Sequence, residues 1–154
     1  MEGVYKCKYL TGRKLRVFLS VADRIIPSDD TPGGGTMTTA GVADWALDRL
    51  KKSIRSQLLL SFLIVEIMGI FFGGRFFTRN TDAAKDRQLQ WMEKNRIRIF
   101  RMMFFGIKSY ICMGYYTRED VWQSIGYEGP LEIDRSYVDP DIRSICDGRM
   151  EVVG

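Results

Sequence analysis

Apolar residues recur at helical spacing along most of the chain. The first stripe lies between Thr11, a residue type that often caps a helix, and Ile26. Pro27 disfavours helical backbone at the residue before it, so this first helix is predicted to end there. An acidic, glycine-rich loop follows over residues 28–35. The stripe consists of Leu15, Phe18, Leu19, Ala22, Ile25 and Ile26.

A second helix is predicted to begin at Thr38 or Thr39. Its expected polar face is Asp44, Asp48, Lys51 and Arg55, and its expected buried face is Val42, Trp45, Ala46 and Leu50. Residues 57–72 are apolar nearly all round, which is typical of a helix at the centre of a bundle. Gly73-Gly74 is predicted to end that helix. Glu66 lies within it, and we expect an ion pair with Arg75 or Arg101.

Asn80, Thr81 and Asp82 offer caps for a helix that runs to about Lys94. The next predicted helix covers about residues 95–113 and ends at Gly114. Its basic face is Lys94, Arg98, Arg101 and Lys108, opposite the apolar Phe100, Met103, Phe104, Ile107 and Ile111. A short helix, Arg118 to Ile125, is predicted between a Thr117 cap and Gly126.

The pattern weakens after Tyr127, where at most a short helix is expected near Asp141 to Cys146. No run of alternating residues is long enough to demand a sheet. The sequence therefore predicts an all-α fold, an irregular helical bundle over residues 1–130. Residues 131–154 are predicted to form an extended C-terminal tail that packs on a partner.

The composition narrows the chemistry open to this chain. The length of 154 residues fits one domain, and the net charge of +4 permits an anionic partner without requiring one. Histidine is absent, and the three cysteines contain no CxxC pair. We therefore predict no catalytic, cofactor-binding or metal-binding residue in this chain. Cys146, in the tail, is expected to be exposed, where it could pair with a partner's cysteine in an oxidising compartment.

Two segments bear on membranes and export. Residues 1–10 have no apolar core and no small-residue cleavage site, so no signal peptide is visible. The apolar run Leu58 to Phe72 is short for a bilayer span and carries Glu66 near its middle. We expect a cytoplasmic location, or export together with a partner that carries the signal.

Aromatic residues gather beside glycines in the segment Gly114 to Pro130. Tyr115, Tyr116 and Tyr127 lie at the ends of the predicted short helix, and Trp122 lies within it. Rigid aromatic anchors on polar turns are typical of partner-binding surfaces. We predict that these four residues, together with Pro130 and Tyr137, bind a partner protein.

Three groups of residues resemble a known family. They are Ala22 to Gly33 with Ala40 to Asp44, then Phe72-Gly-Gly-Arg-Phe76, and lastly the segment from Gly114-Tyr-Tyr-Thr117 through Ile125-Gly-Tyr-Glu-Gly-Pro130. In their order and spacing, these segments are similar to the gluconate 2-dehydrogenase subunit 3 family, the small subunit of membrane-associated gluconate dehydrogenases.

The resemblance implies a non-catalytic subunit that supports folding of a large flavoprotein of the glucose–methanol–choline oxidoreductase class. That partner would bind FAD and pass electrons to a haem-containing protein or a quinone, and membrane association could come through the complex. The family often carries a twin-arginine export signal, which is not visible here.

Two other functions stay open from the residues alone. The face from Lys94 to Lys108 could bind nucleic acid, although the aromatic residues of its helix lie on the opposite side. The phenylalanine pairs Phe71-Phe72 and Phe76-Phe77, with nearby arginines, could bind a membrane surface peripherally.

Overall fold

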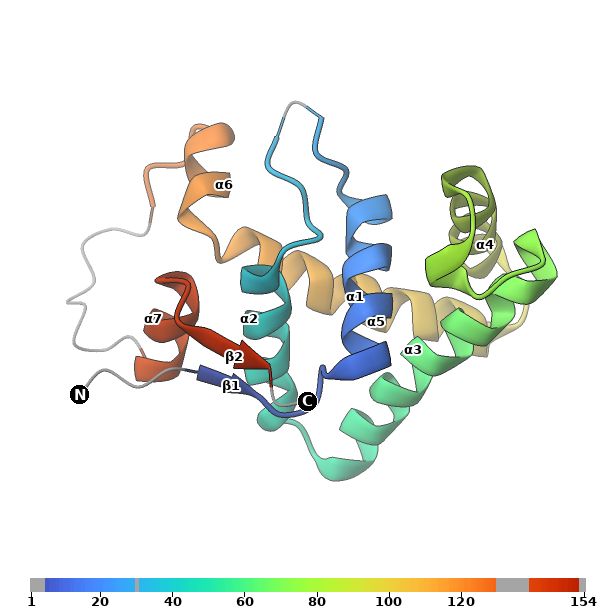
Figure 1. Cartoon of the computed structure of the whole chain (residues 1–154), viewed down its shortest axis with the longest axis horizontal. Coiled ribbons are helices and arrows are strands. Elements are labelled where there is room, and N and C mark those ends of the chain that lie inside the picture. Colours follow the sequence, from blue (N-terminus) through green and yellow to red (C-terminus); the bar gives the residue numbers. More distant parts are fainter. Residues whose placement is uncertain (1–4, 30, 130–138, 153–154) are drawn as a thin grey trace.

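The structure is a computed structural model that describes residues 5–29, 31–129 and 139–152. Within these ranges the fold is all-α, with one short pair of β-strands (Figure 1). The helices are α1 (Gly12–Ile25), α2 (Met37–Asp48), α3 (Lys52–Gly73), α4 (Asp82–Lys94), α5 (Arg98–Tyr116), α6 (Glu119–Ser124) and α7 (Pro140–Cys146). A 3-10 turn, η1 (Phe77–Arg79), joins α3 to α4, and the strands are β1 (Tyr5–Cys7) and β2 (Met150–Val152).

Most predicted helix ends are confirmed, because local signals set them. Thr11 precedes α1, and the Thr81 side chain accepts a hydrogen bond from the amide of Ala84 at the start of α4. Gly74 adopts the left-handed conformation, with φ of 73°, that ends α3. The second helix begins slightly earlier than predicted, since Thr36 caps it.

Two helix predictions are wrong. The polar face predicted from Asp44 to Arg55 spans two helices, since the chain leaves helical backbone between Asp48 and Lys52. Gly114 does not end a helix either, because α5 continues through it to Tyr116.

The core lies between α1, α2, α3 and α5. Fully buried Phe18, Phe62, Ile107 and Ile111 fill it, and the Phe18 and Phe62 rings lie 5.7 Å apart. The predicted apolar side of α5 is confirmed: Met103, Phe104, Ile107 and Ile111 are buried and Phe100 is partly buried. Burial of this apolar surface is the main stabilising contribution.

The strands were not predicted. β1 pairs in parallel with β2, which places Tyr5 opposite Met150, and α7 packs on α2. Each strand has only three residues, too few to show an alternating pattern. Thus residues 139–152 pack on the N-terminal part of the same chain, and the predicted short helix near Asp141 is confirmed as α7.

Asp44 organises this corner of the fold. The prediction that it lies on a polar helix face is wrong, since its relative exposure is 0%. Its carboxylate accepts hydrogen bonds from the backbone amides of Lys8, Tyr9 and Leu10, at 2.8, 2.8 and 2.6 Å. The Tyr5 hydroxyl donates a fourth bond at 3.0 Å, and burial together with this carboxylate raises the pKa of Tyr5.

Glu66 is also buried, but the predicted ion pair with an arginine is wrong. Its carboxylate accepts from the amide of Thr78 at 3.0 Å and from the Thr78 hydroxyl at 2.8 Å. These bonds fix η1 against α3, where Gly69 lets the backbone of Phe77 approach closely. Glu66 therefore has a structural partner on the same chain.

Helix α3 differs from a fully buried bundle centre. By length and composition, α3 is the one helix among the described residues that could cross a membrane. Only 33% of its most apolar 18-residue stretch is buried inside the protein. Core helices of soluble proteins can have the same length and apolar composition, but they are mostly buried. Its exposed side therefore needs a physical explanation.

Candidate functional site

The structure brings the two longest segments of the family resemblance together through Arg118. Arg118 is 8% exposed and lies just before α6. Its Nη1 donates to the carbonyl oxygen of Gly33 at 2.7 Å and to the hydroxyl of Thr36 at 3.0 Å. The glycine-rich loop is thus attached to the segment that carries the clustered aromatic residues.

Asp120 completes this contact on the opposite side of the guanidinium. Arg118 Nε donates to Asp120 Oδ1 at 3.0 Å, and Nη2 bonds the other carboxylate oxygen. A planar guanidinium fits two carboxylate oxygens at once, which fixes its orientation. The hydrogen bond and charge of Arg118 lower the pKa of Asp120, so the carboxylate is ionised at neutral pH.

Close helix packing supports the same region. Gly114 of α5 lies against the backbone carbonyl of Thr39 in α2, with no room for a Cβ atom between them. The Thr39 and Thr36 hydroxyls lie 2.9 Å apart beside Arg118. This short distance between α2 and α5 places the loop within reach of Arg118.

Beyond this contact, Trp122 of α6 and the residues that flank this helix form a partly exposed aromatic surface. We define the aromatic end of the molecule as Tyr116, Trp122, Ile125 and Tyr127. Trp122 Nε1 donates to the carbonyl oxygen of Tyr116 at 2.6 Å, and the Trp122 and Tyr127 rings meet edge to face at 5.8 Å. Tyr116, Ile125 and Tyr127 are each about half exposed. Rings held rigidly yet exposed lose little entropy on binding a partner.

The predicted partner-binding residues divide into three groups. Tyr116, Trp122 and Tyr127 come together at the aromatic end. Tyr115 is buried and packs edge to face against Tyr116, so its ring lies inside the domain. Pro130 and Tyr137 lie outside the described residues.

Sequence reasoning did not single out Arg118, Thr36 or Asp120. The only signal was that Arg118 and Asp120 are charged residues inside an otherwise aromatic segment. The partners of Arg118 in the glycine-rich loop, Gly33 and Thr36, are more than 80 positions away along the chain. Spacing in the sequence cannot show such a contact.

No group of three or more His, Cys, Asp or Glu residues in the described ranges could hold a metal ion. The Cys7 thiol is buried, and desolvation together with Asp44 raises its pKa to about 12. Cys146 is exposed, as predicted. Partial desolvation, with the carboxylates of Glu119 and Asp147, raises the pKa of Cys146.

Comparisons of the chain with known protein families, with curated proteins and with solved structures gave no match. The family resemblance described above therefore stays a prediction from the sequence.

Arg118→Ala should release the glycine-rich loop. The substitution leaves the Gly33 carbonyl and the Asp120 carboxylate without their donor, and we expect a loss of about 2–3 kcal/mol in the free energy of unfolding. Urea unfolding would measure this loss, and endoproteinase Asp-N, which cuts before aspartate, should cut faster at Asp29 in this loop. Arg98→Ala, at an exposed arginine of α5, is the control and should change neither. An unaltered cleavage rate for Arg118→Ala would refute this role.

Proposed function

We propose that this chain is a non-catalytic small subunit of a flavin-dependent dehydrogenase complex. Its role is to support folding and assembly of a large FAD-binding subunit that oxidises a sugar, an alcohol or a similar substrate. The partner holds the FAD and passes electrons to a haem-containing protein or a quinone. This chain supplies binding surface rather than reacting groups.

The observation that carries the proposal is the Arg118 contact. The resemblance to the family rests on segments that are far apart in the sequence, and Arg118 joins two of them directly. The third segment ends α3 at Gly74 in its left-handed conformation. The resembling residues thus have linked structural roles, which is what a shared fold would require.

The aromatic end supports a role in partner binding. Tyrosine and tryptophan are enriched among the residues that contribute most to protein–protein affinity. Trp122 and Tyr127 hold each other in place, and the Arg118 contact fixes the start of their helix. A surface prepared in this way is suited to a protein partner.

Purification of the tagged full-length chain from its own organism tests the proposal. We expect one protein to co-purify in near-equal amount, with the absorption bands of FAD and with dehydrogenase activity towards an artificial electron acceptor. A chain that purifies without a flavoprotein would overturn the proposal. So would a co-purified flavoprotein that folds and binds FAD equally well when this chain is deleted.

Paired variants locate the interface. Trp122→Ser with Tyr127→Ser should weaken binding of the flavoprotein by about tenfold or more, because both anchors are lost. Phe105→Ser is the matched control, since Phe105 is an even more exposed aromatic residue on a different helix, α5. Equal retention of the flavoprotein by the double variant and the control would remove the aromatic end from the interface.

A further inference from the structure

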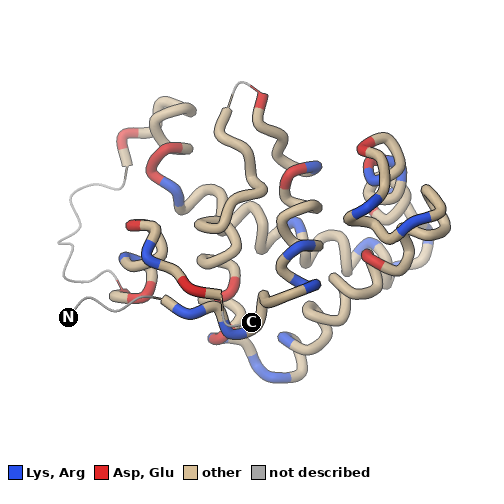
Figure 2. The backbone as a smooth tube through the Cα atoms, in the orientation of Figure 1, with Lys and Arg blue, Asp and Glu red and all other residues tan. Residues whose placement is uncertain are grey.

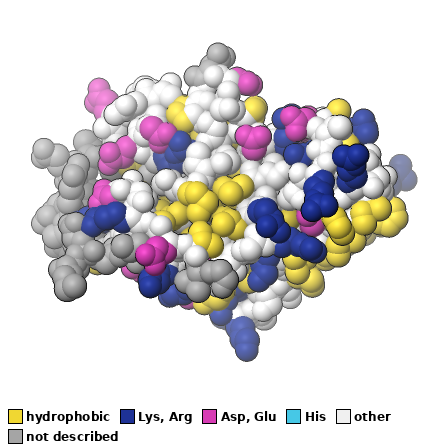
Figure 3. Space-filling view, in the orientation of Figure 1, with side chains coloured by type: hydrophobic (Ala, Val, Ile, Leu, Met, Phe, Trp, Pro, Cys, Tyr) yellow, Lys and Arg dark blue, Asp and Glu magenta, His cyan; other side chains and the backbone are white. Residues whose placement is uncertain are grey.

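Helix α3 exposes an apolar stripe along its length. Leu60, Ile67 and Phe71 recur at the spacing of one helix face, and Phe71 is 85% exposed. The opposite face of α3, with Phe62 and Val65, is buried in the core. Figure 3 shows hydrophobic side chains beside lysine and arginine over this part of the surface.

Helix α5 contributes a shallow depression next to α3. Arg98, Arg101, Met102, Phe105 and Gly106 line it, and Phe105 is 72% exposed. A Cβ atom on Gly106 would lie 3.4 Å from the Cδ1 of Leu58, so α5 meets the buried side of α3 at this point. We call the α3 stripe and this depression together the basic apolar face.

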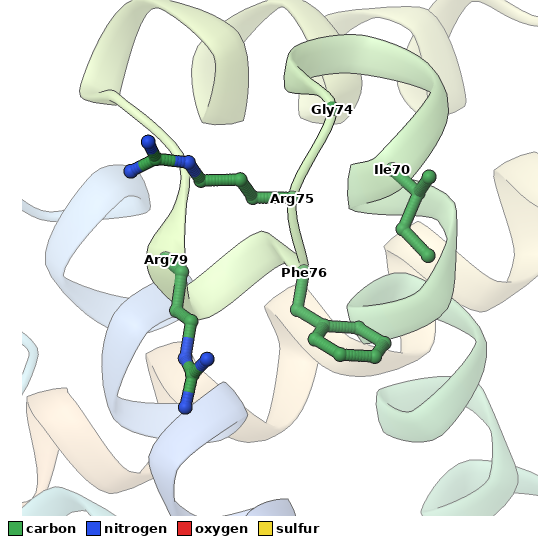
Figure 4. A pocket seen from close by; sticks show the side chains of 5 residues that line it. All are labelled: Ile70, Gly74, Arg75, Phe76 and Arg79. Atoms are coloured by element: carbon green, nitrogen blue, oxygen red, sulfur yellow. The ribbon is translucent and has the colours of Figure 1, made fainter.

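Two arginines flank the C-terminal end of the stripe. Arg75 and Arg79 line a shallow pocket with Ile70, Gly74 and Phe76. Figure 4 shows the two arginine side chains extended on one side of this pocket, and Ile70 and the Phe76 ring on the other. Neither guanidinium has an ion pair or side-chain hydrogen bond among the described residues. Both are therefore available to an anionic ligand.

Charge is distributed unevenly along the chain. Residues 51–108 hold 12 of the 23 basic residues and only four of the 19 acidic ones, a net charge of +8, which leaves −4 on the rest. Figure 2 shows basic residues at the start of α3 and in the turn that follows it, with one acidic residue on the helix between them.

The four acids of this segment already have partners. The Glu66 carboxylate accepts a hydrogen bond from Thr78. Both Asp82 and Asp86 form ion pairs with Arg24, and Glu93 Oε1 lies 3.8 Å from Lys108 Nζ. None of these four acids therefore pairs with Arg75, Arg79, Arg98 or Arg101 of the basic apolar face.

We propose that the basic apolar face binds the surface of a bilayer that contains anionic lipids. The apolar stripe would enter the boundary between headgroups and acyl chains, and the arginines would contact lipid phosphates. Lys51 and Lys52 at one end of α3 and Arg75 and Arg79 at the other lie about 30 Å apart, as expected for 22 helical residues. A flat anionic surface can contact both ends at once.

Other arrangements fit these observations less well. A bilayer-spanning α3 would have to give up the core packing of Phe62 and the bonds between Glu66 and Thr78. A symmetric dimer through this face would bring two segments of +8 together, which like-charge repulsion disfavours.

The structure also changes which phenylalanines can bind a membrane. Phe77 is fully buried, so its predicted contribution is wrong, and the partly buried Phe72 packs on Trp91. Phe71 and Phe105 take their place as the most exposed aromatic residues. The membrane proposal does not depend on the proposed function, because the aromatic end stays free for a protein partner.

Co-sedimentation of the purified chain with vesicles tests the proposal. We expect binding to vesicles of equal parts phosphatidylglycerol and phosphatidylcholine, and much weaker binding to phosphatidylcholine alone. Phe71→Ser with Phe105→Ser should weaken binding by about tenfold or more. Arg75→Gln with Arg79→Gln should weaken it by about fivefold per arginine, with a smaller salt dependence.

Tyr127→Ser is the matched control and should bind vesicles like the unaltered chain, with circular dichroism confirming that every variant is folded. Equal binding to both vesicle types would overturn the proposal, as would binding that the phenylalanine substitutions leave unchanged. Loss of flavoprotein binding in Phe71→Ser with Phe105→Ser, without vesicle binding by the unaltered chain, would also overturn it and assign the face to a protein.

Discussion

Replacing Asp44 by alanine should lower the free energy of unfolding by about 3–5 kcal/mol, a large part of the stability of an ordinary domain. The carboxylate is buried and accepts from three consecutive backbone amides and from the Tyr5 hydroxyl. Alanine would leave these donors without a partner in a site closed to water, and each unsatisfied buried group carries a penalty. Urea unfolding followed by circular dichroism would measure the loss.

Asp48→Ala is the matched control, one helical turn away on α2. Asp48 bonds the Lys8 ammonium at 2.9 Å and the Tyr9 hydroxyl at 2.7 Å, but it is partly exposed. Solvent screens such pairs, so we expect a loss of about 1 kcal/mol or less. If the two alanine variants unfold at the same urea concentration, Asp44 does not organise the N-terminal segment.

The helices could be predicted because their signals are local. Thr81, Gly73-Gly74 and the apolar stripe of α1 each act within a few residues, and the structure places helix ends beside them. The β1–β2 pair could not be predicted, because its strands lie at opposite ends of the chain. Asp44 was misassigned for a related reason: its partners lie more than 30 residues earlier.

The candidate site shows the same limit. The aromatic residues in and around α6 stand out in the sequence, and three of the predicted residues do come together. Arg118 does not stand out, because its role depends on the carbonyl oxygen of Gly33. The basic apolar face was also out of reach, since an apolar run in the sequence does not show which side remains exposed.

Helix α5 contains two glycines, Gly106 and Gly114, and only Gly114 is required by close packing against another helix. At Gly114 an added methyl group would overlap the carbonyl oxygen of Thr39, a backbone atom that cannot turn aside. Gly114→Ala should therefore push α5 away from α2 and destabilise the protein by about 2–3 kcal/mol. Because Thr36 and Thr39 would move away from Arg118, the glycine-rich loop should also become more sensitive to endoproteinase Asp-N, which cuts before Asp29.

Gly106→Ala is the matched control in the same helix. Its methyl group would make only an ordinary contact, 3.4 Å from the flexible end of Leu58. Alanine is the better helix former, so this variant should be unchanged or more stable by up to about 1 kcal/mol. Thermal unfolding of both variants gives the comparison. If Gly114→Ala is as stable as Gly106→Ala, then α5 and α2 do not meet through Gly114, and the close approach that positions Arg118 does not depend on this glycine.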